Sequence, residues 1–90
     1  MPRFYFDLVD GLHSGDAEGA ELQSVIEARL EAVRLAGAYV RDNPELVQDS
    51  SVFRVLVFDE GRTLLTTITV AGADSPTMQD RIKAETNRLG

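Results

Sequence analysis

The chain has 90 residues, of which 43% are hydrophobic and 27% are charged, the proportions of an ordinary globular domain. It contains no cysteine, which excludes disulfides and thiolate metal sites, and its formal charge of −6 disfavours binding to nucleic acids or anionic lipids. No segment approaches the ~20 apolar residues that a membrane span requires. We therefore expect one small acidic domain that is soluble and cytoplasmic, with neither a nucleic-acid nor a membrane partner.

The first expected element is a strand near residues 3–9. Apolar side chains recur there at every second position, at Phe4, Phe6 and Leu8, as they do in a strand with one face in a core. The pairs Asp10-Gly11 and Ser14-Gly15 then indicate turns. The short segment 17–22 is expected to return as a second, weaker strand.

A helix over residues 25–42 follows. Ser24 and Glu27 fit the capping box that begins many helices, and Pro44 makes continuation beyond Asn43 unfavourable. An alanine-rich apolar stripe runs along one face of this helix, which we expect to pack closely against a sheet.

The pattern changes to two segments rich in β-branched residues, 52–58 and 63–70, which predict a hairpin. We expect the turn between them to use Gly61. The inward-facing residues are expected to be Phe53, Val55, Val57, Leu64, Ile68 and Val70. Leu56 and Phe58 are then left on the far face beside Leu65, where they form a candidate interface for a second protomer or another protein.

The remaining residues, 73–90, are expected to form an extension to a single domain of residues 1–72. Ser75 and Pro76 are a helix-start signal, so the extension is predicted to be a short helix. Its apolar stripe is narrow and consists of Met78, Ile82 and Leu89.

No catalytic motif is present, and we assign no catalytic, cofactor-binding or metal-binding residue. His13 is the only histidine, and the acids near it in the sequence are Asp7, Asp10 and Asp16. A metal site built on one histidine needs further ligands that only carboxylates can supply. A small metal-dependent hydrolase that uses these four residues remains an alternative, whereas our leading expectation is that the chain is not an enzyme and needs no cofactor.

Arg29 is unusual because it lies within the apolar arc of the expected helix. A charge in that position needs a partner or access to water. One hypothesis is an ion pair with Asp7, Asp16 or Glu18, and the other is that the guanidinium extends into solvent at the edge of the sheet.

The chain resembles an uncharacterised family of small bacterial proteins, a domain of unknown function. The resemblance spans roughly Pro2 to Val70 and rests on four segments, MPRFYFDLVDG, DAEGAEL, EARLEAVRLAGAYV and VFRVLVFDEGRTLLTTITV. It implies no catalytic or binding residue. The order of elements is also similar to that of HicB-like antitoxin domains, which bind a toxin and often dimerise, a likeness at the level of the fold alone.

We expect an α+β fold in which an antiparallel sheet of three to four strands packs on one main α-helix, in the order β-β-α-β-β, with a short C-terminal helix. The biological function is unknown from sequence. The leading hypothesis is a non-enzymatic protein-interaction module that forms a homodimer. The alternatives are an antitoxin-like partner of a small basic protein, favoured by the charge of −6, and the metal-dependent hydrolase.

Overall fold

The computed structural model describes residues 1–48 and 51–89. The elements in order are β1 (Arg3–Val9), β2 (His13–Ser14), β3 (Ala20–Glu21), α1 (Val25–Asp42), a 3-10 turn (Pro44–Leu46), β4 (Val52–Phe58), β5 (Leu64–Ala71) and α2 (Pro76–Leu89). Parts of two expected segments, residues 49–50 of the connection before β4 and residue 90 of the extension, lie outside the described residues.

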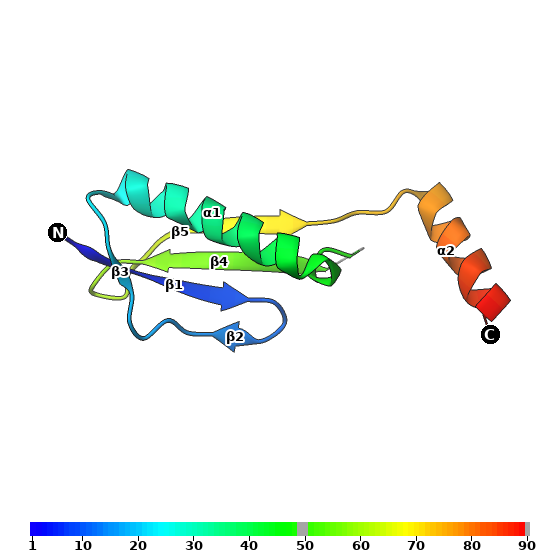
Figure 1. Ribbon diagram of the computed structural model, residues 1–90, viewed down its shortest axis with the longest axis horizontal. Helices are drawn as coiled ribbons and strands as arrows, with labels where there is room; N and C mark the ends of the chain where they lie inside the picture. Colours follow the sequence, from blue (N-terminus) through cyan, green and yellow to red (C-terminus); the bar gives the residue numbers. More distant parts are fainter. Residues whose placement is uncertain (49–50, 90) are drawn as a thin grey trace.

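The fold is α+β, as the sequence predicts. The strands form one antiparallel sheet in the order β2-β1-β4-β5, and β3 pairs with the other end of β1. The helix α1 lies across one face of this sheet (Figure 1), mainly over β4 and β5. Ser24 begins α1 as expected, because its side-chain oxygen accepts a hydrogen bond from the Glu27 amide at 3.1 Å.

The core lies between α1 and the sheet. The helix contributes only small buried side chains, Ala28, Ala32 and Ala36, so its backbone approaches the strands closely. The sheet contributes Phe4, Phe6, Phe53, Val55 and Val57, all buried. Tyr39 of α1 stacks on the Phe53 ring with centroids 5.3 Å apart. The burial of these apolar side chains is the main source of stability for this domain, which has no cysteine and therefore no disulfide.

The expected second strand over 17–22 is present in shortened form as β3, which pairs antiparallel with β1, and a further strand of two residues, β2, precedes it. Between them the chain leaves the edge of β1, and the side chain of Asp16 takes the place of a strand there. Its Oδ2 accepts a hydrogen bond of 3.0 Å from the Phe6 amide. A carboxylate therefore satisfies the backbone donor that a neighbouring strand would otherwise bind.

Two details of the β4–β5 hairpin differ from expectation. A register shift between Val57 and Phe58 turns Leu64 away from the core, where its side chain is 52% exposed instead of buried. The positive φ of the turn belongs to Arg62, at 60°, rather than to Gly61. An arginine in this left-handed region is uncommon and points to side-chain contacts that favour it.

The helix α2 stands apart from the domain at the end of a short connection (Figure 1), and the described molecule is correspondingly elongated, with extents of 56 × 21 × 20 Å. All its described side chains are exposed. Leu89, the third expected member of its apolar stripe, has a side chain outside the described part. Within residues 1–48 and 51–89, no helix has the length and apolar character needed to cross a membrane.

A substitution at Gly19 can test the path that the backbone takes between β2 and β3. Its φ is +70°, and a β-carbon there would lie 2.6 Å from the Phe4 carbonyl oxygen. We predict that Gly19→Ala lowers the free energy of unfolding by about 2–4 kcal/mol in urea titrations, because strain and a clash add. Gly15→Ala is the matched control, since a β-carbon at Gly15 meets nothing within 4 Å. Equal stability of the two variants would show that this path is wrong.

Candidate functional sites at a buried carboxylate and an open sheet edge

The most buried charged side chain is that of Asp7, which is 1% exposed. It alternates along β1 with the core residues Phe6 and Leu8, so it lies on the face of the sheet opposite α1. Its Oδ1 accepts a hydrogen bond from the Asp16 amide at 3.0 Å. Its Oδ2 accepts from His13 Nε2 at 2.8 Å and from Arg62 Nη2 at 3.0 Å. An ionised carboxylate only accepts, so the proton of this His13 contact is on Nε2.

Arg62 reaches Asp7 from the β4–β5 turn, 55 residues away in sequence. On its way the guanidinium covers two aromatic rings that pair across the strands, with its central carbon 4.5 Å from the Phe58 centroid and 5.4 Å from that of Tyr5. These cation–π contacts and the ion pair explain why the turn tolerates a positive φ at Arg62.

Asp16 continues the cluster on the other side of Asp7. Besides the Phe6 amide, it accepts hydrogen bonds from the amides of Glu18 at 3.1 Å and Gly19 at 3.0 Å. Each of the two carboxylates thus accepts three hydrogen bonds from the protein. Together they fasten the 13–19 segment and the β4–β5 turn to β1.

These contacts change the acidity of both carboxyl groups. Burial by itself would raise the pKa of Asp7, but the Asp16 amide, the His13 ring and the Arg62 guanidinium together lower it below the ordinary value of 3.8. Burial would likewise raise the pKa of Asp16, and the amides of Gly19, Phe6 and Glu18 outweigh it, so that this pKa is also lowered. Both groups are therefore ionised at neutral pH.

The cluster brings together three residues of the hydrolase alternative, Asp7, His13 and Asp16, but not Asp10. The side chain of Asp10 instead accepts a hydrogen bond from the Leu12 amide at 3.3 Å. A buried carboxylate that orients an imidazole is an arrangement found in general bases. Here, however, the same oxygen also binds Arg62, and both carboxylates are occupied by protein donors. Among the described residues, no group of three or more His, Asp or Glu side chains is placed to bind a metal ion.

The structure does not bring Arg29 to the acids suggested from sequence. The ion pairs of the described residues include none between Arg29 and Asp7, Asp16 or Glu18. Arg29 is exposed and lines a hollow beside β5, at the other edge of the sheet from the acidic segment. Sequence reasoning missed Arg62, the cation that does bind Asp7. The sequence did contain a signal for this contact, namely an acid inside a predicted strand, Asp7, and an arginine in the turn of the predicted hairpin, Arg62.

The candidate interface of Leu56, Phe58 and Leu65 is divided in the structure. Leu56 and Phe58 are half-buried on the face opposite α1, and Arg62 covers the Phe58 ring. Leu65 is 40% exposed and lines the hollow next to α1. Its use as an interface stays a prediction.

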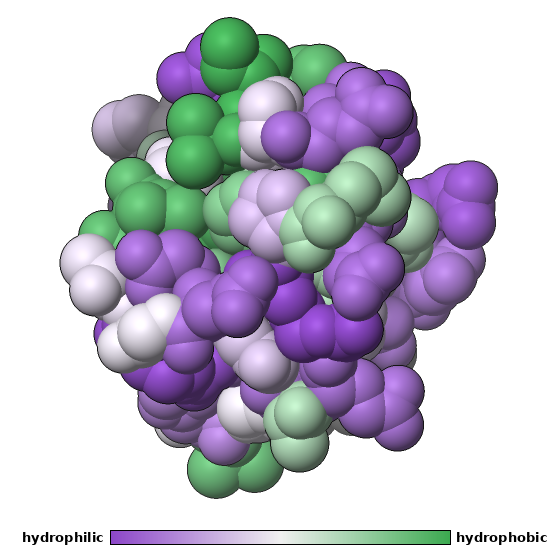
Figure 2. Space-filling view, turned by 90° about the vertical axis from the view of Figure 1, so that its left-hand side faces the viewer, coloured by the Kyte–Doolittle hydropathy of each residue, from purple (hydrophilic) through white to green (hydrophobic). Residues whose placement is uncertain are grey.

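A second apolar surface lies along the outer edge of β5. Residues 64–71 form the end strand of the sheet, and no described strand pairs with their outer side. The flank of α1 above this edge carries large exposed apolar residues: Val25, Ile26, Leu30 and Val33. Figure 2 shows hydrophobic residues gathered at the top and upper left of the end of the molecule where α1 begins. We refer to β5 and this flank of α1 together as the β5 edge.

Comparison with known proteins gives one match. Residues 3–71 match the model of a family described as Domain of unknown function (DUF6894), which covers every element except α2. No curated protein and no solved structure matches the chain. The comparisons show no similarity to HicB-like antitoxins.

The Asp7 cluster predicts a large effect of one small substitution. Asp7→Asn keeps the shape of the side chain but removes the buried charge that binds His13 and Arg62. We expect it to lower the free energy of unfolding by about 2–3 kcal/mol. Asp10→Asn, three residues away in the turn after β1 and exposed, is the control and should change it by less than about 0.5 kcal/mol. Chemical denaturation measures both free energies of unfolding. An Asp7→Asn variant as stable as the natural chain would contradict a stabilising role for the contacts of Asp7 with His13, Asp16 and Arg62.

The lowered pKa values also predict an acid transition. Because Asp7 and Asp16 release protons more readily in the folded state, their contribution to stability is complete above the ordinary pKa of 3.8 and is lost as the pH falls below that value through the lower folded pKa values. Urea unfolding between about pH 6 and about pH 2.5 should therefore show a smaller acid loss in Asp7→Asn than in the natural chain. Equal losses would mean that Asp7 has the same pKa in both states.

Proposed function

The chain belongs to this family of domains of unknown function, and we propose that it is a non-enzymatic protein-interaction module that forms a homodimer through its β5 edge. The observation that carries the proposal is the long open edge strand beside an exposed apolar helix flank. Two arguments support it, one from the strand and one from the helix, and charge does not oppose it.

Apart from the register shift at its beginning, the strand β5 lacks the features that normally prevent edge-to-edge pairing. Its eight residues, LLTTITVA, include no charge, no proline and no glycine. The opposite edge of the sheet is protected, because β2, β3 and the Asp16 side chain cover the outer side of β1. An antiparallel edge is complementary to a second copy of itself about a two-fold axis, which makes β5 of another copy its natural partner.

The position of α1 fits the same dimer. Strands lie about 4.8 Å apart, and α1 packs over β4 and β5, so two copies joined at β5 would carry their α1 helices about 10 Å apart. Packed helices are typically 8–10 Å apart. The side chains between them would include Ile26 and Val33, which are 59% and 50% exposed in one copy.

Charge does not oppose this contact. The formal charge of −6 gives two copies a repulsion at long range, which salt screens beyond about 8 Å under physiological conditions. The strand that meets its copy is uncharged. No comparable observation supports the two alternatives. The antitoxin-like hypothesis rests only on the order of elements and the charge. The hydrolase hypothesis rests on Asp7 and Asp16, whose carboxylates already bind backbone amides of the protein itself.

The helix flank gives a test with a matched control. Val33→Glu introduces a charge where two copies of α1 would meet, and we expect it to raise the dimer dissociation constant at least about tenfold, which corresponds to about 1.4 kcal/mol. Leu12→Glu introduces the same charge at a residue that is 78% exposed in the β1–β2 turn, far from the β5 edge, and should change the constant less than about twofold. Sedimentation equilibrium measures both constants.

Two results would contradict the proposal. One is a monomeric mass for the natural chain at every concentration up to about 1 mM, because a dissociation constant above that concentration is too weak for a specific complex. The other is a dimer that Val33→Glu and Leu12→Glu weaken equally, because the contact would then lie elsewhere.

A further inference from the structure

A groove lies along β1 on the face of the sheet that carries α1. Because α1 packs mainly over β4 and β5, it leaves part of this face of β1 uncovered. The segment between β2 and β3 leaves the edge of β1, and Gly15 and Gly19 in this segment bring no side chain into the gap. A groove therefore opens between α1 and residues 14–22, with Phe6 and Leu8 of β1 in its lining.

The size and lining of this groove are those of a site for a small molecule. Its volume is about 590 Å³, within the range of about 300–1,000 Å³ that such sites occupy. Its apolar lining includes three half-buried leucines that pack against the core without being fully covered: Leu8, Leu22 and Leu35. Covering apolar surface of this kind with a ligand is favourable.

The charged side chains at the groove are negative. Asp16 and Glu31 line it from opposite walls, and no basic side chain lines it in the described part of the chain. Asp16 is ionised at neutral pH because three backbone amides lower its pKa, and no ion pair of the described residues includes it. Glu31 is 3.5 Å from Arg34, and both side chains are too exposed for this ion pair to be strong. A ligand in the groove therefore lies near two carboxylates.

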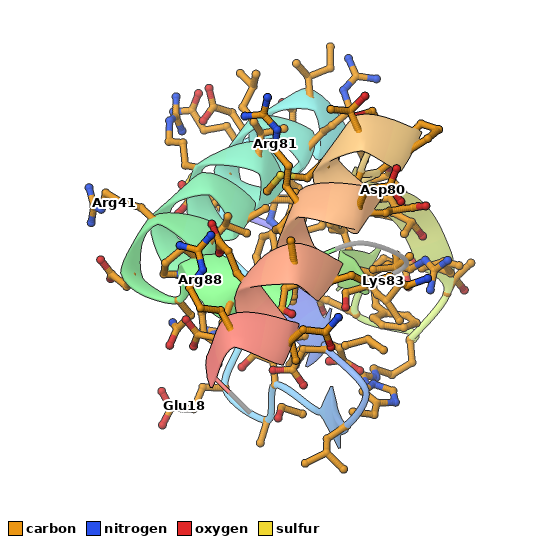
Figure 3. All side chains as sticks on the ribbon, turned by 90° about the vertical axis from the view of Figure 1, so that its right-hand side faces the viewer. Glu18, Arg41, Asp80, Arg81, Lys83 and Arg88 are labelled. Carbon is orange, nitrogen blue, oxygen red and sulfur yellow. The ribbon has the colours of Figure 1, made fainter. Side chains whose placement is uncertain are left out.

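Basic residues elsewhere in the chain are held away from these two carboxylates. Figure 3 shows the basic residues of α2 on a helix that stands apart from the domain: Arg81, Lys83 and Arg88. Arg3 contacts the same segment as Asp16, but it binds the Glu18 carbonyl oxygen at 2.8 Å and the Glu21 carboxylate at 3.2 Å. The Glu18 side chain extends into solvent below α1 (Figure 3), which adds a negative charge to this wall of the groove.

We infer that this groove binds a small organic cation, with its ammonium group near Asp16 and Glu31 and its apolar body against the leucines that line the groove. The site is independent of the proposed homodimer, because the groove lies beside β1 whereas β5 forms the other edge of the sheet. Each copy in the dimer would keep its groove open to a ligand.

A series of three probes with the same apolar body tests the charge of the ligand. Phenylbutylamine is a cation at neutral pH, phenylbutanol is neutral and phenylbutyrate is an anion. Titration of the natural chain, followed by its amide shifts in two-dimensional NMR spectra, should give a dissociation constant of about 1 mM or below for the amine. The alcohol should bind at least about fivefold more weakly, and the anion more weakly than the alcohol. The shifted amides should belong to residues 14–22 and to α1 near Glu31 and Leu35.

A substitution in the wall of the groove locates the site. Glu31→Lys reverses one of the two charges and should raise the dissociation constant for phenylbutylamine at least about fivefold. Glu85→Lys makes the same change of net charge at an exposed residue of the detached α2, and should change the constant less than about 1.5-fold. Glutamate and lysine have similar helix propensities, so both variants should fold, which their amide spectra without probe will show.

Several results would overturn the inference. One is the absence of saturable shifts with phenylbutylamine up to about 5 mM. Equal dissociation constants for the amine and the alcohol, or equal effects of the two variants, would mean that the carboxylates of the groove do not select the ligand. Shifts confined to the hollow beside β5 would place the bound amine elsewhere. Amine-dependent shifts in α2 would show that α2 itself fills the groove, in place of a small molecule.

Discussion

The ionised carboxylate of Asp7 is the interaction on which the arrangement of this small sheet depends. It lies in the middle of β1 with 1% of its surface exposed and binds a residue from each of the segments that cover that strand. A charge in such a place is costly unless it is paired and hydrogen-bonded. His13, Asp16 and Arg62 meet that requirement, and in doing so they fix the positions of the 13–19 segment and the β4–β5 turn.

These contacts of Asp7 also make the two edges of the sheet unequal. On the β1 side, the strands β2 and β3 and the Asp16 side chain bind the backbone along the outer side of β1, so another strand cannot add there. On the β5 side, an uncharged strand of eight residues remains open below the apolar flank of α1. Closing one edge directs association to the other, which connects the polar cluster to the proposed dimer although the cluster does not touch the proposed contact.

The sequence predicts the main elements well because each has a strong local signal. The bounds of α1 follow from the cap at Ser24 and the proline at Pro44, and those of β1 and β4 follow from their alternating apolar residues. The partner of Asp7 was missed because Arg62 is 55 residues away and the contact depends on a register shift and a positive φ that no local pattern announces. The interface predicted at Leu56, Phe58 and Leu65 was likewise inferred without this arginine, which covers Phe58, and it stays a prediction.

The most direct test of the account is an isotope-filtered nuclear Overhauser measurement on a mixture of labelled and unlabelled copies. Such a measurement detects only contacts between different chains. The account predicts backbone contacts between residues 64–71 of one copy and residues 64–71 of the other, in antiparallel register. Contacts that instead join the face of Leu56 and Phe58, or no contacts between chains at a concentration of about 1 mM, would contradict it.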